Sequence, residues 1–291
     1  MRLCPVCQNR FDPPLLECLR CDFLLTKIDG FNCFAPEKAL QDGGFDPTFF
    51  SHLRDASDWH FFLKYRNRLI LSSLQRYFPN FQSFLEIGCG TGTVLQAISR
   101  RYPLRNICGS DVYIEGLKFA RSYVGSQPSL FQMDALKIPF SEAFDIIGLF
   151  DVIEHIEHQD DVLQGVFKAL KYDGGVILTA PQHPILWSKG DEKVHHKRRY
   201  RIGELARTVQ AAGFELVYQT SYNTLLLPAL ALSRILTAQK KYNAALEWDL
   251  HPILNSLFNS ISIIEGAINR HIRLPFGSSV LVIGRKSCGV N

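Results

Sequence analysis

The fold is decided by one stretch, Phe84-Leu85-Glu86-Ile87-Gly88-Cys89-Gly90-Thr91-Gly92-Thr93. A short apolar run contains an acid, three glycines then alternate with small residues, and a helical pattern follows at once. This order predicts a strand, a tight turn and a helix N-terminus, which is where an open α/β sheet binds a nucleotide-like ligand. Glycines suit such a turn because the backbone bends sharply and a Cβ would collide with the ligand.

The spacing of the glycines narrows the ligand. Gly88-x-Gly90-x-Gly92 differs from the G-x-G-x-x-G of dinucleotide enzymes, and no lysine follows it as in a P-loop. An acid before the first glycine, Glu86, would repel a pyrophosphate but suits an ammonium group. The stretch resembles motif I of class I S-adenosylmethionine (SAM) dependent methyltransferases. A chance glycine-rich turn is the alternative, and the rest of the chain decides between them.

Two further acids follow predicted strands at suitable distances. The first closes residues 106–111 and lies 19 residues beyond Gly92, and the second follows residues 130–133. A carboxylate at the first place can accept both ribose hydroxyls. A helix cap or turn residue is the alternative for Asp134. The resemblance implies the full cofactor-binding set, with Asp111 on the ribose and Asp134 on the adenine: Glu86, Gly88, Cys89, Gly90, Gly92, Asp111, Val112, Asp134, Ala135, Phe150 and Asp151.

Alternating strand and helix patterns continue to the end of the chain and predict an α/β doubly wound sheet. The resemblance implies a seven-stranded, Rossmann-like methyltransferase sheet and covers about residues 81–222 and 278–286. We therefore expect a SAM-binding methyltransferase domain over 81–291. An apolar, helical insertion, about 225–274, precedes the last strand. It can cap the pocket, form a homodimer face or rest on a membrane surface as a peripheral contact.

Residues 1–30 carry two Cys-x-x-Cys pairs. Two such pairs can close a tetrahedron of thiolates around Zn²⁺, and a segment this small needs a metal to fold. The segment resembles the zinc ribbons that precede some bacterial methyltransferases, with a structural role for the zinc; disulfides or free thiols are the alternative. The predicted metal ligands are Cys4, Cys7, Cys18 and Cys21.

Residues 31–80 are interpreted as a linker and an N-terminal helix. Proline and glycine signals mark the linker up to residue 57, and a helix is expected over 58–78 with Ser57 or Asp58 as its N-cap. Its aromatic start predicts either a helix packed on the core or a wall of the substrate pocket. In the second interpretation Trp59 and Tyr65 bind substrate.

The chemistry is expected on two loops over the sheet. After the strand 144–150, Asp151-x-x-Glu154-His155 resembles an element of ubiquinone-type O-methyltransferases that can hold a divalent cation. Helix capping by Glu154 and a base or core role for His155 are the alternatives. The catalytic candidates are His155, Glu154, His183 and His196.

The second loop is the basic part of the chain, with six Lys/Arg and two acids between Lys189 and Arg201. Its sequence HHKRRY (195–200) resembles the His-x-Arg-Arg-Tyr loop of methyltransferases near glycan and lipid pathways. Arg198, Arg199 and Tyr200 are therefore candidates for binding substrate, because arginine pairs suit phosphate or carboxylate groups. A solvated loop whose arginines pair with nearby acids is the alternative.

Bulk properties limit the function classes. The net charge of +4 over 291 residues does not demand nucleic acid, no apolar run is long enough to span a bilayer, and no secretory signal is visible, so a cytoplasmic enzyme is expected. The leading hypothesis is SAM-dependent methyl transfer, at oxygen, to a small-molecule, lipid-linked or glycan-linked acceptor. An RNA methyltransferase that uses the zinc ribbon to bind RNA is the second. A non-catalytic SAM-fold partner protein is the third.

Overall fold

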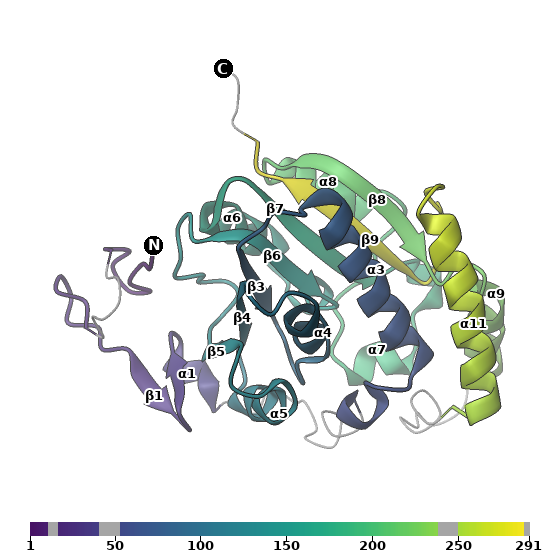
Figure 1. Cartoon of the computed structure of the whole chain (residues 1–291), viewed down its shortest axis with the longest axis horizontal. Helices are drawn as coiled ribbons and strands as arrows, with labels where there is room; N and C mark the ends of the chain where they lie inside the picture. Colours follow the sequence, from purple (N-terminus) through teal and green to yellow (C-terminus); the bar gives the residue numbers. More distant parts are fainter. Residues whose placement is uncertain (11–16, 41–52, 238–249, 288–291) are drawn as a thin grey trace.

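A single mixed sheet organises the computed structural model, which describes residues 1–10, 17–40, 53–237 and 250–287 (Figure 1). The strands lie in the order β1-β2-β5-β4-β3-β6-β7-β9-β8. Their bounds are β1 Thr26–Ile28, β2 Phe31–Cys33, β3 Ser83–Ile87, β4 Asn106–Asp111, β5 Ser129–Gln132, β6 Phe144–Phe150, β7 Leu170–Pro181, β8 Glu215–Tyr222 and β9 Ser279–Arg285.

Seven of these strands, β5-β4-β3-β6-β7-β9-β8, form the sheet predicted from the sequence. Strands β3 to β7 run parallel, and β9 runs antiparallel to both of its neighbours. The seven-stranded sheet that the resemblance implies is therefore confirmed. The order reverses between β4 and β6, on either side of β3, and such a switch point leaves a crevice at the carboxyl ends of the strands.

Helices cover both faces of the sheet. Strand β3 shows the principle: Leu85 and Ile87 lie in a core that includes α6 and α8, whereas Phe84 lies in the opposite core with α3, α4 and α5. Burial on both faces explains why the sequence of β3 is mostly apolar. The helices are α1 Pro36–Ala39, α3 Phe61–Tyr77, α4 Thr93–Arg101, α5 Ile114–Val124, α6 Gln159–Ala169, α7 Lys189–Lys193, α8 Glu204–Ala211, α9 Leu227–Thr237 and α11 Pro252–Asn269.

The stretch interpreted as a linker, 31–57, differs from that expectation at its start. Strand β2 forms a hairpin with β1 and pairs in parallel with β5, so the hairpin extends the sheet to nine strands. Asp29 and Gly30 both have positive φ, as the turn of a two-residue hairpin requires. Three-residue strands are too short to show an alternating pattern. The signals at Gly43, Gly44 and Pro47 lie outside the described residues.

The helix expected over 58–78 begins later, at Phe61. His60 is its N-cap and accepts a hydrogen bond from the Phe62 N–H at 3.3 Å. Asp58, the expected cap, instead accepts a hydrogen bond from the Tyr123 hydroxyl at 2.6 Å, a contact with α5 that local sequence does not reveal. The rest of the helix is as predicted and packs against α4.

The N-terminal segment is attached to the sheet by backbone contacts. The Leu3 N–H donates to the Pro139 carbonyl at 2.9 Å, and Arg2 forms a bridge with Phe140. Its cysteines share the core that contains Met133 and Ile138. The segment is therefore continuous with the core of the larger domain, at the edge of the sheet opposite α9 and α11 (Figure 1).

The insertion contains α9 and α11, which confirms a helical insertion before the last strand. Helix α11 lies along α3 (Figure 1). Its buried side chains are polar: Asn255, Ser262, Glu265 and Asn269. Five of its large apolar side chains are exposed, whereas Phe258, Ile261 and Ile268 are half-buried; the exposed ones are Ile253, Leu254, Leu257, Ile263 and Ile264. An amphipathic helix more often buries its apolar face, so the polar contact surface of α11 is unusual.

Candidate functional site

A cavity of about 1220 Å³ opens at the carboxyl ends of the parallel strands. Residues that close or follow successive strands line it, among them Gly88, Asp111, Asp134 and Asp151. Its far wall comes from α3, the loop around α7, and the insertion helices α9 and α11. The volume exceeds that of an ordinary ligand pocket, so it can hold two small molecules together.

The glycine turn forms the floor of the cavity with the backbone that the sequence predicts. Gly88, Gly90 and Gly92 have φ of +72°, +50° and +81°. A Cβ on Gly88 would lie 2.5 Å from the Val152 side chain, whereas one on Gly90 would meet no protein atom within 4 Å. Gly90 therefore leaves open space on the cavity side. Gly92 does not line the cavity and instead allows close packing against Ala120 of α5.

Glu86, on β3, is the buried acid of this floor. It is 3% exposed, and its Oε2 atom has no hydrogen-bond partner among the described residues. Burial raises its pKa to about 8, although the Arg66 guanidinium opposes the rise. An unsatisfied carboxyl oxygen at a cavity wall suits a ligand that carries an ammonium group, because burial makes an unpartnered charge costly.

The acids predicted after β4 and β5 also line the cavity. Asp111 accepts hydrogen bonds from the Gly90 N–H at 2.9 Å and the Tyr113 N–H at 3.0 Å, so it is fixed against the glycine turn. Asp134 accepts from Leu136 N–H at 3.0 Å and forms an ion pair with Lys38 at 2.6 Å. Lys38, from α1, also lines the cavity.

Asp151 follows β6 with a positive φ of 57° and points its carboxyl group at α3. It pairs with Arg66 at 2.6 Å and accepts a hydrogen bond from the Thr179 hydroxyl at 3.0 Å. Arg66 also donates to the Thr93 hydroxyl at 3.2 Å, so it joins α3 to the start of α4. Both oxygens of Asp151 are thus held by neutralising or donating groups.

A cluster of titratable groups on η1 (Ile153–His155) and around α7 also lines the cavity. Asp191 accepts a 2.7 Å hydrogen bond from His196 Nδ1 and two from Arg199, at 2.8 and 3.0 Å. Burial opposes ionisation of Asp191, but His196 and Arg199 outweigh it and hold the pKa of that carboxyl well below its usual value. Asp191 therefore stays ionised and fixes the ring of His196.

His196 Nε2 lies 3.7 Å from Oε1 of Glu154, which is fully buried. Neither oxygen of Glu154 has a hydrogen-bond partner among the described residues, and burial raises the pKa of this carboxyl well above its usual value. The ring of His155 lies 4.7 Å from that of His196, and burial lowers the pKa of His155 to about 4. A neutral imidazole that faces a cavity can accept a proton.

The same cluster corrects the expected composition of the divalent cation site. Ligand atoms of Glu154, His155 and His196 lie within 4.8 Å of one another. Asp151, the expected third ligand, is occupied by Arg66 instead. His196 comes from the other loop, so the set could not be read from one short motif.

Several predicted residues lie off the cavity. Tyr65 is buried and its hydroxyl donates to Glu265 at 3.0 Å, while Tyr200 donates to Gln159 at 2.6 Å. Arg198 donates to the Glu157 carbonyl at 3.0 Å. Trp59 and His183 do not line the cavity either. Five residues were expected to bind substrate, and only Arg199 lies on the cavity wall, where it holds Asp191. The other four do not line the cavity.

The residues that sequence reasoning missed are Lys38, Arg66 and Asp191. Lys38 and Arg66 form ion pairs with residues far away in the sequence, so no local pattern identifies them. Asp191 does belong to a local pattern, Ser188-x-x-Asp191. This pattern is a capping box, and both of its hydrogen bonds are present at the start of α7. The pattern could have located α7, but it does not show that the capping acid also holds a histidine.

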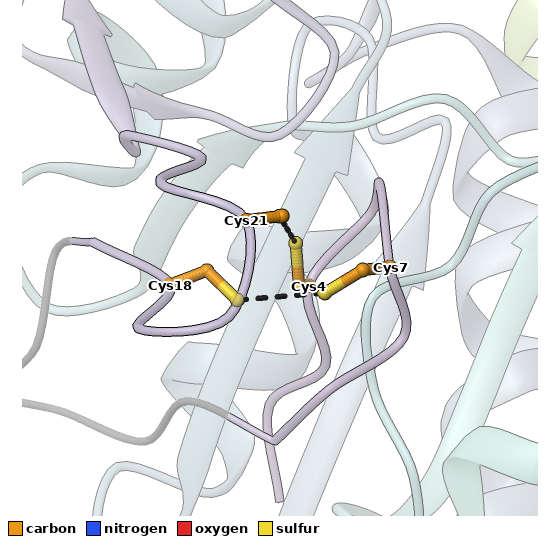
Figure 2. A group of neighbouring side chains, drawn as sticks. All are labelled: Cys4, Cys7, Cys18 and Cys21. Carbon is orange, nitrogen blue, oxygen red and sulfur yellow. Dashed lines mark hydrogen bonds between the residues drawn. The ribbon is translucent and has the colours of Figure 1, made fainter.

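The four cysteines of the N-terminal segment converge on one point (Figure 2). The Sγ atoms of Cys4 and Cys21, and those of Cys7 and Cys18, are 3.5 Å apart, and all four lie within 4.8 Å of one another. A disulfide would need about 2.05 Å, whereas sulfurs about 2.3 Å from a tetrahedral zinc are separated by close to the observed spacing. The geometry therefore fits a four-thiolate metal site.

Comparison with known proteins agrees with this geometry. The ubiquinone biosynthesis O-methyltransferase of Candida albicans is 29% identical over 101 residues, which is 33% of this chain and 31% of that protein. The demethylmenaquinone methyltransferase of Lactobacillus johnsonii is 30% identical over 112 residues, 35% of this chain and 46% of that protein. The aligned part thus spans about a third to a half of these relatives' length.

Among solved structures, Haemonchus contortus phosphoethanolamine N-methyltransferase 2 in complex with SAM has the same fold, with a TM-score of 0.58 at 16% identity. The match covers 86% of this chain and 59% of that one. The sequence also matches the family described as methyltransferase domain over residues 62–219, more than half of its length. These residues include the glycine turn and all the acids of the cavity, and the chain belongs to the methyltransferase domain family.

Proposed function

We propose that this protein transfers a methyl group from SAM to a hydroxyl of a small, largely apolar acceptor. One observation carries the proposal: the unsatisfied carboxyl of Glu86, the open Gly90 and a histidine held by an ionised acid, His196, all line one cavity. The named relatives from quinone biosynthesis support methyl transfer to a small molecule.

The floor of the cavity is where SAM would be held. Glu86 would accept the ammonium group, the backbone at Gly90 would approach the amino-acid tail, and Asp111 would accept the ribose hydroxyls. Asp134 would face the adenine, with its carboxyl group held in place by the ion pair with Lys38. Bound there, SAM supplies an electrophilic methyl carbon, so the protein has to orient the acceptor and exclude water.

His196 is the proposed general base. Asp191 accepts the hydrogen bond of Nδ1, which leaves Nε2 directed toward Glu154 and the cavity. Nε2 can then take the proton of an acceptor hydroxyl, and the carboxylate of Asp191 stabilises the imidazolium that forms. Asp191 acts through His196 and is a positioning residue, and Arg199 holds Asp191 in turn.

A divalent cation held by Glu154, His155 and His196 is the alternative use of this cluster, favoured by the spacing of their ligand atoms. Activity that is lost on chelation and restored by Mg²⁺ or Mn²⁺ would establish it. Activity that persists after chelation would leave His196 as the base.

Tritiated SAM tests the function itself. The purified protein and labelled SAM would be incubated with a cell extract that is then separated into small molecules, lipids, RNA and protein. We expect label in the small-molecule or lipid fraction. Label in RNA would establish the RNA methyltransferase hypothesis, and SAM binding without any label would favour the non-catalytic one.

A matched pair of glycine variants tests the cofactor site. Gly90 and Gly30 both have positive φ and open space at the Cβ, but only Gly90 lines the cavity. Gly90→Arg should abolish SAM binding in calorimetry while the chain stays folded, and Gly30→Arg should bind SAM normally. Normal binding by Gly90→Arg would mean that the cofactor lies elsewhere.

A further inference from the structure

The insertion presents an apolar surface that the rest of the protein leaves uncovered. On α11, Ile253 is 73% exposed, Leu257 53% and Ile264 57%. On α9, Leu232 is 56% exposed. Exposed apolar groups gathered on one element mark a contact surface, whereas scattered ones need no explanation.

Polar contacts hold α11 in this orientation. The Asn255 side chain accepts from the Phe61 N–H at 2.9 Å and donates to the Trp59 carbonyl at 2.8 Å, at the start of α3. Glu265 accepts from the Tyr65 hydroxyl at 3.0 Å and from the Leu225 N–H at 2.8 Å. These buried groups would lose their partners if the helix turned over, so the outward apolar face is built into the fold.

The charges of the insertion point to the kind of partner. In its described parts, 225–237 and 250–274, the one acid is Glu265, which is buried. Arg270 and Arg273 follow α11 and are exposed. An apolar helix face that is followed by two exposed arginines, with no exposed acid in these described parts, complements a surface that is apolar inside and anionic at its rim, as a bilayer with acidic lipids is.

The same helices form part of the cavity wall. The cavity is lined by Leu226, just before α9, by Leu230 of α9, and by Leu254 and Phe258 of α11. The apolar face therefore lies on the other side of the wall that an apolar acceptor would contact. No helix in the described residues has the length and apolar composition needed to cross a bilayer, so a contact by this face would be with the membrane surface.

We propose that α9 and α11 dock the protein on the surface of an anionic membrane, with the apolar side chains of α11 in the interface. An acceptor with an apolar tail could then enter the cavity from the bilayer. That last step rests on the proposed function, but the docking does not.

Vesicle sedimentation tests the docking without SAM or acceptor. Vesicles of phosphatidylcholine alone are compared with vesicles that contain about one third phosphatidylglycerol, since acidic lipids attract Arg near the surface. We expect clear binding to the second and weak binding to the first. Ile253→Asn with Ile264→Asn should weaken binding roughly tenfold or more, because two apolar side chains no longer enter the interface. Leu104→Asn is the matched control: Leu104 is 96% exposed but outside the insertion, so binding should not change.

Sedimentation velocity tests the alternative, that a second copy of this chain binds the apolar face of α11. A dimer that the paired asparagine variant converts to a monomer, together with no vesicle binding by the wild type, would overturn the proposal. So would equal binding of the wild type and the paired variant. Both substitutions are on the exposed side of α11, and an unchanged unfolding midpoint would show that the variant is folded.

Discussion

At the residue scale, Glu86 links proton binding to ligand binding. Its pKa of about 8 in the folded protein is above its ordinary value of 4.5, so the folded state holds the proton more tightly. The group therefore contributes stability below pH 4.5, which is lost progressively as the pH rises through about 8. A ligand ammonium group prefers the ionised carboxylate and must displace that proton.

We therefore predict that SAM affinity rises with pH between about 5.5 and 7.5, by up to about tenfold per pH unit. Calorimetry in two buffers of different ionisation enthalpy should detect release of up to one proton per SAM bound. Glu86→Gln, which keeps the shape of the side chain, should bind SAM more weakly and without this proton release. Proton release that persists in Glu86→Gln would assign the linkage to a different group.

His196 and Asp191 give the second residue-scale prediction. His196→Asn should lower kcat by about 100-fold to 10,000-fold, the usual contribution of a general base. The Kd for SAM should stay the same, because His196 is hydrogen-bonded to Asp191 and to none of the residues proposed to hold SAM. His195→Asn, at an exposed neighbouring position, is the control and should retain kcat.

Asp191→Asn separates positioning from folding. Loss of its charge should lower kcat and leave the SAM Kd unchanged, and Asp191→Glu should recover part of kcat. If the variant instead lost SAM binding and stability together, the role of Asp191 would be confined to holding the loop.

The acids Glu86, Asp111 and Asp134 of the cavity could be predicted from the sequence because each one lies in or directly after a parallel strand. Register alone then brings Glu86, Asp111 and Asp134 to one edge. The ion pairs Arg66–Asp151 and Lys38–Asp134 could not be predicted from the sequence, because their members are 85 and 96 residues apart. Those contacts depend on how helices settle on the sheet, which local patterns do not specify.

At the element scale, the seam between α3 and α11 is a set of buried polar groups. Glu265→Ala would leave the Tyr65 hydroxyl and the Leu225 N–H without an acceptor, so we expect a loss of about 2–4 kcal/mol in the free energy of unfolding. Tyr65→Phe should cost about 1–2 kcal/mol, because it removes the hydroxyl that donates to Glu265 and accepts from Asn269 but leaves the ring in place. Denaturant titration measures both.

The double variant tests whether these groups act together. If the hydroxyl and the carboxyl form one unit, the two losses should not add, and the double variant should be more stable than their sum predicts. Additive losses would show that Glu265 stabilises the chain chiefly through the N–H of Leu225.

Elements with a strong pattern were predicted and weak ones were not. The strands expected at 106–111, 130–133 and 144–150 lie close to their predicted places, as β4, β5 and β6, and the insertion is helical as expected. The hairpin of β1 and β2 was missed, since pairing with β5 rather than propensity makes those three-residue segments strands. The burial of polar side chains of α11 against α3 could not be predicted, because the composition of the helix does not show which groups it meets in the fold.

At the scale of the whole molecule, the cysteine cluster and the sheet form one body. We predict about one zinc per chain in purified protein, and clearly less after Cys18→Ser, because three thiolates hold zinc more weakly than four. Cys108→Ser is the control, since Cys108 lies in the sheet and outside the cluster. Metal analysis measures both, and a folded, metal-free wild type would contradict the assignment.

Hydrogen exchange shows how far the effect of zinc reaches. After chelation, amides of residues 4–10 and 17–33 should exchange quickly, while those of β3, β6 and β7 stay protected in the core. Loss of protection throughout would mean that the metal supports the entire fold.

The hairpin at the end of the sheet has a consequence for any shortened form of this chain. The Gln132 side chain, at the end of β5, accepts from the Ala35 N–H at 3.0 Å and donates to the Ala35 carbonyl at 2.9 Å, as a neighbouring strand would. Without residues 1–40, β5 would become a bare edge with unpaired backbone groups, a template for sticking to other copies. We therefore expect residues 1–40 to protect the edge of β5 from aggregation, and a shortened protein that begins after residue 40 should aggregate.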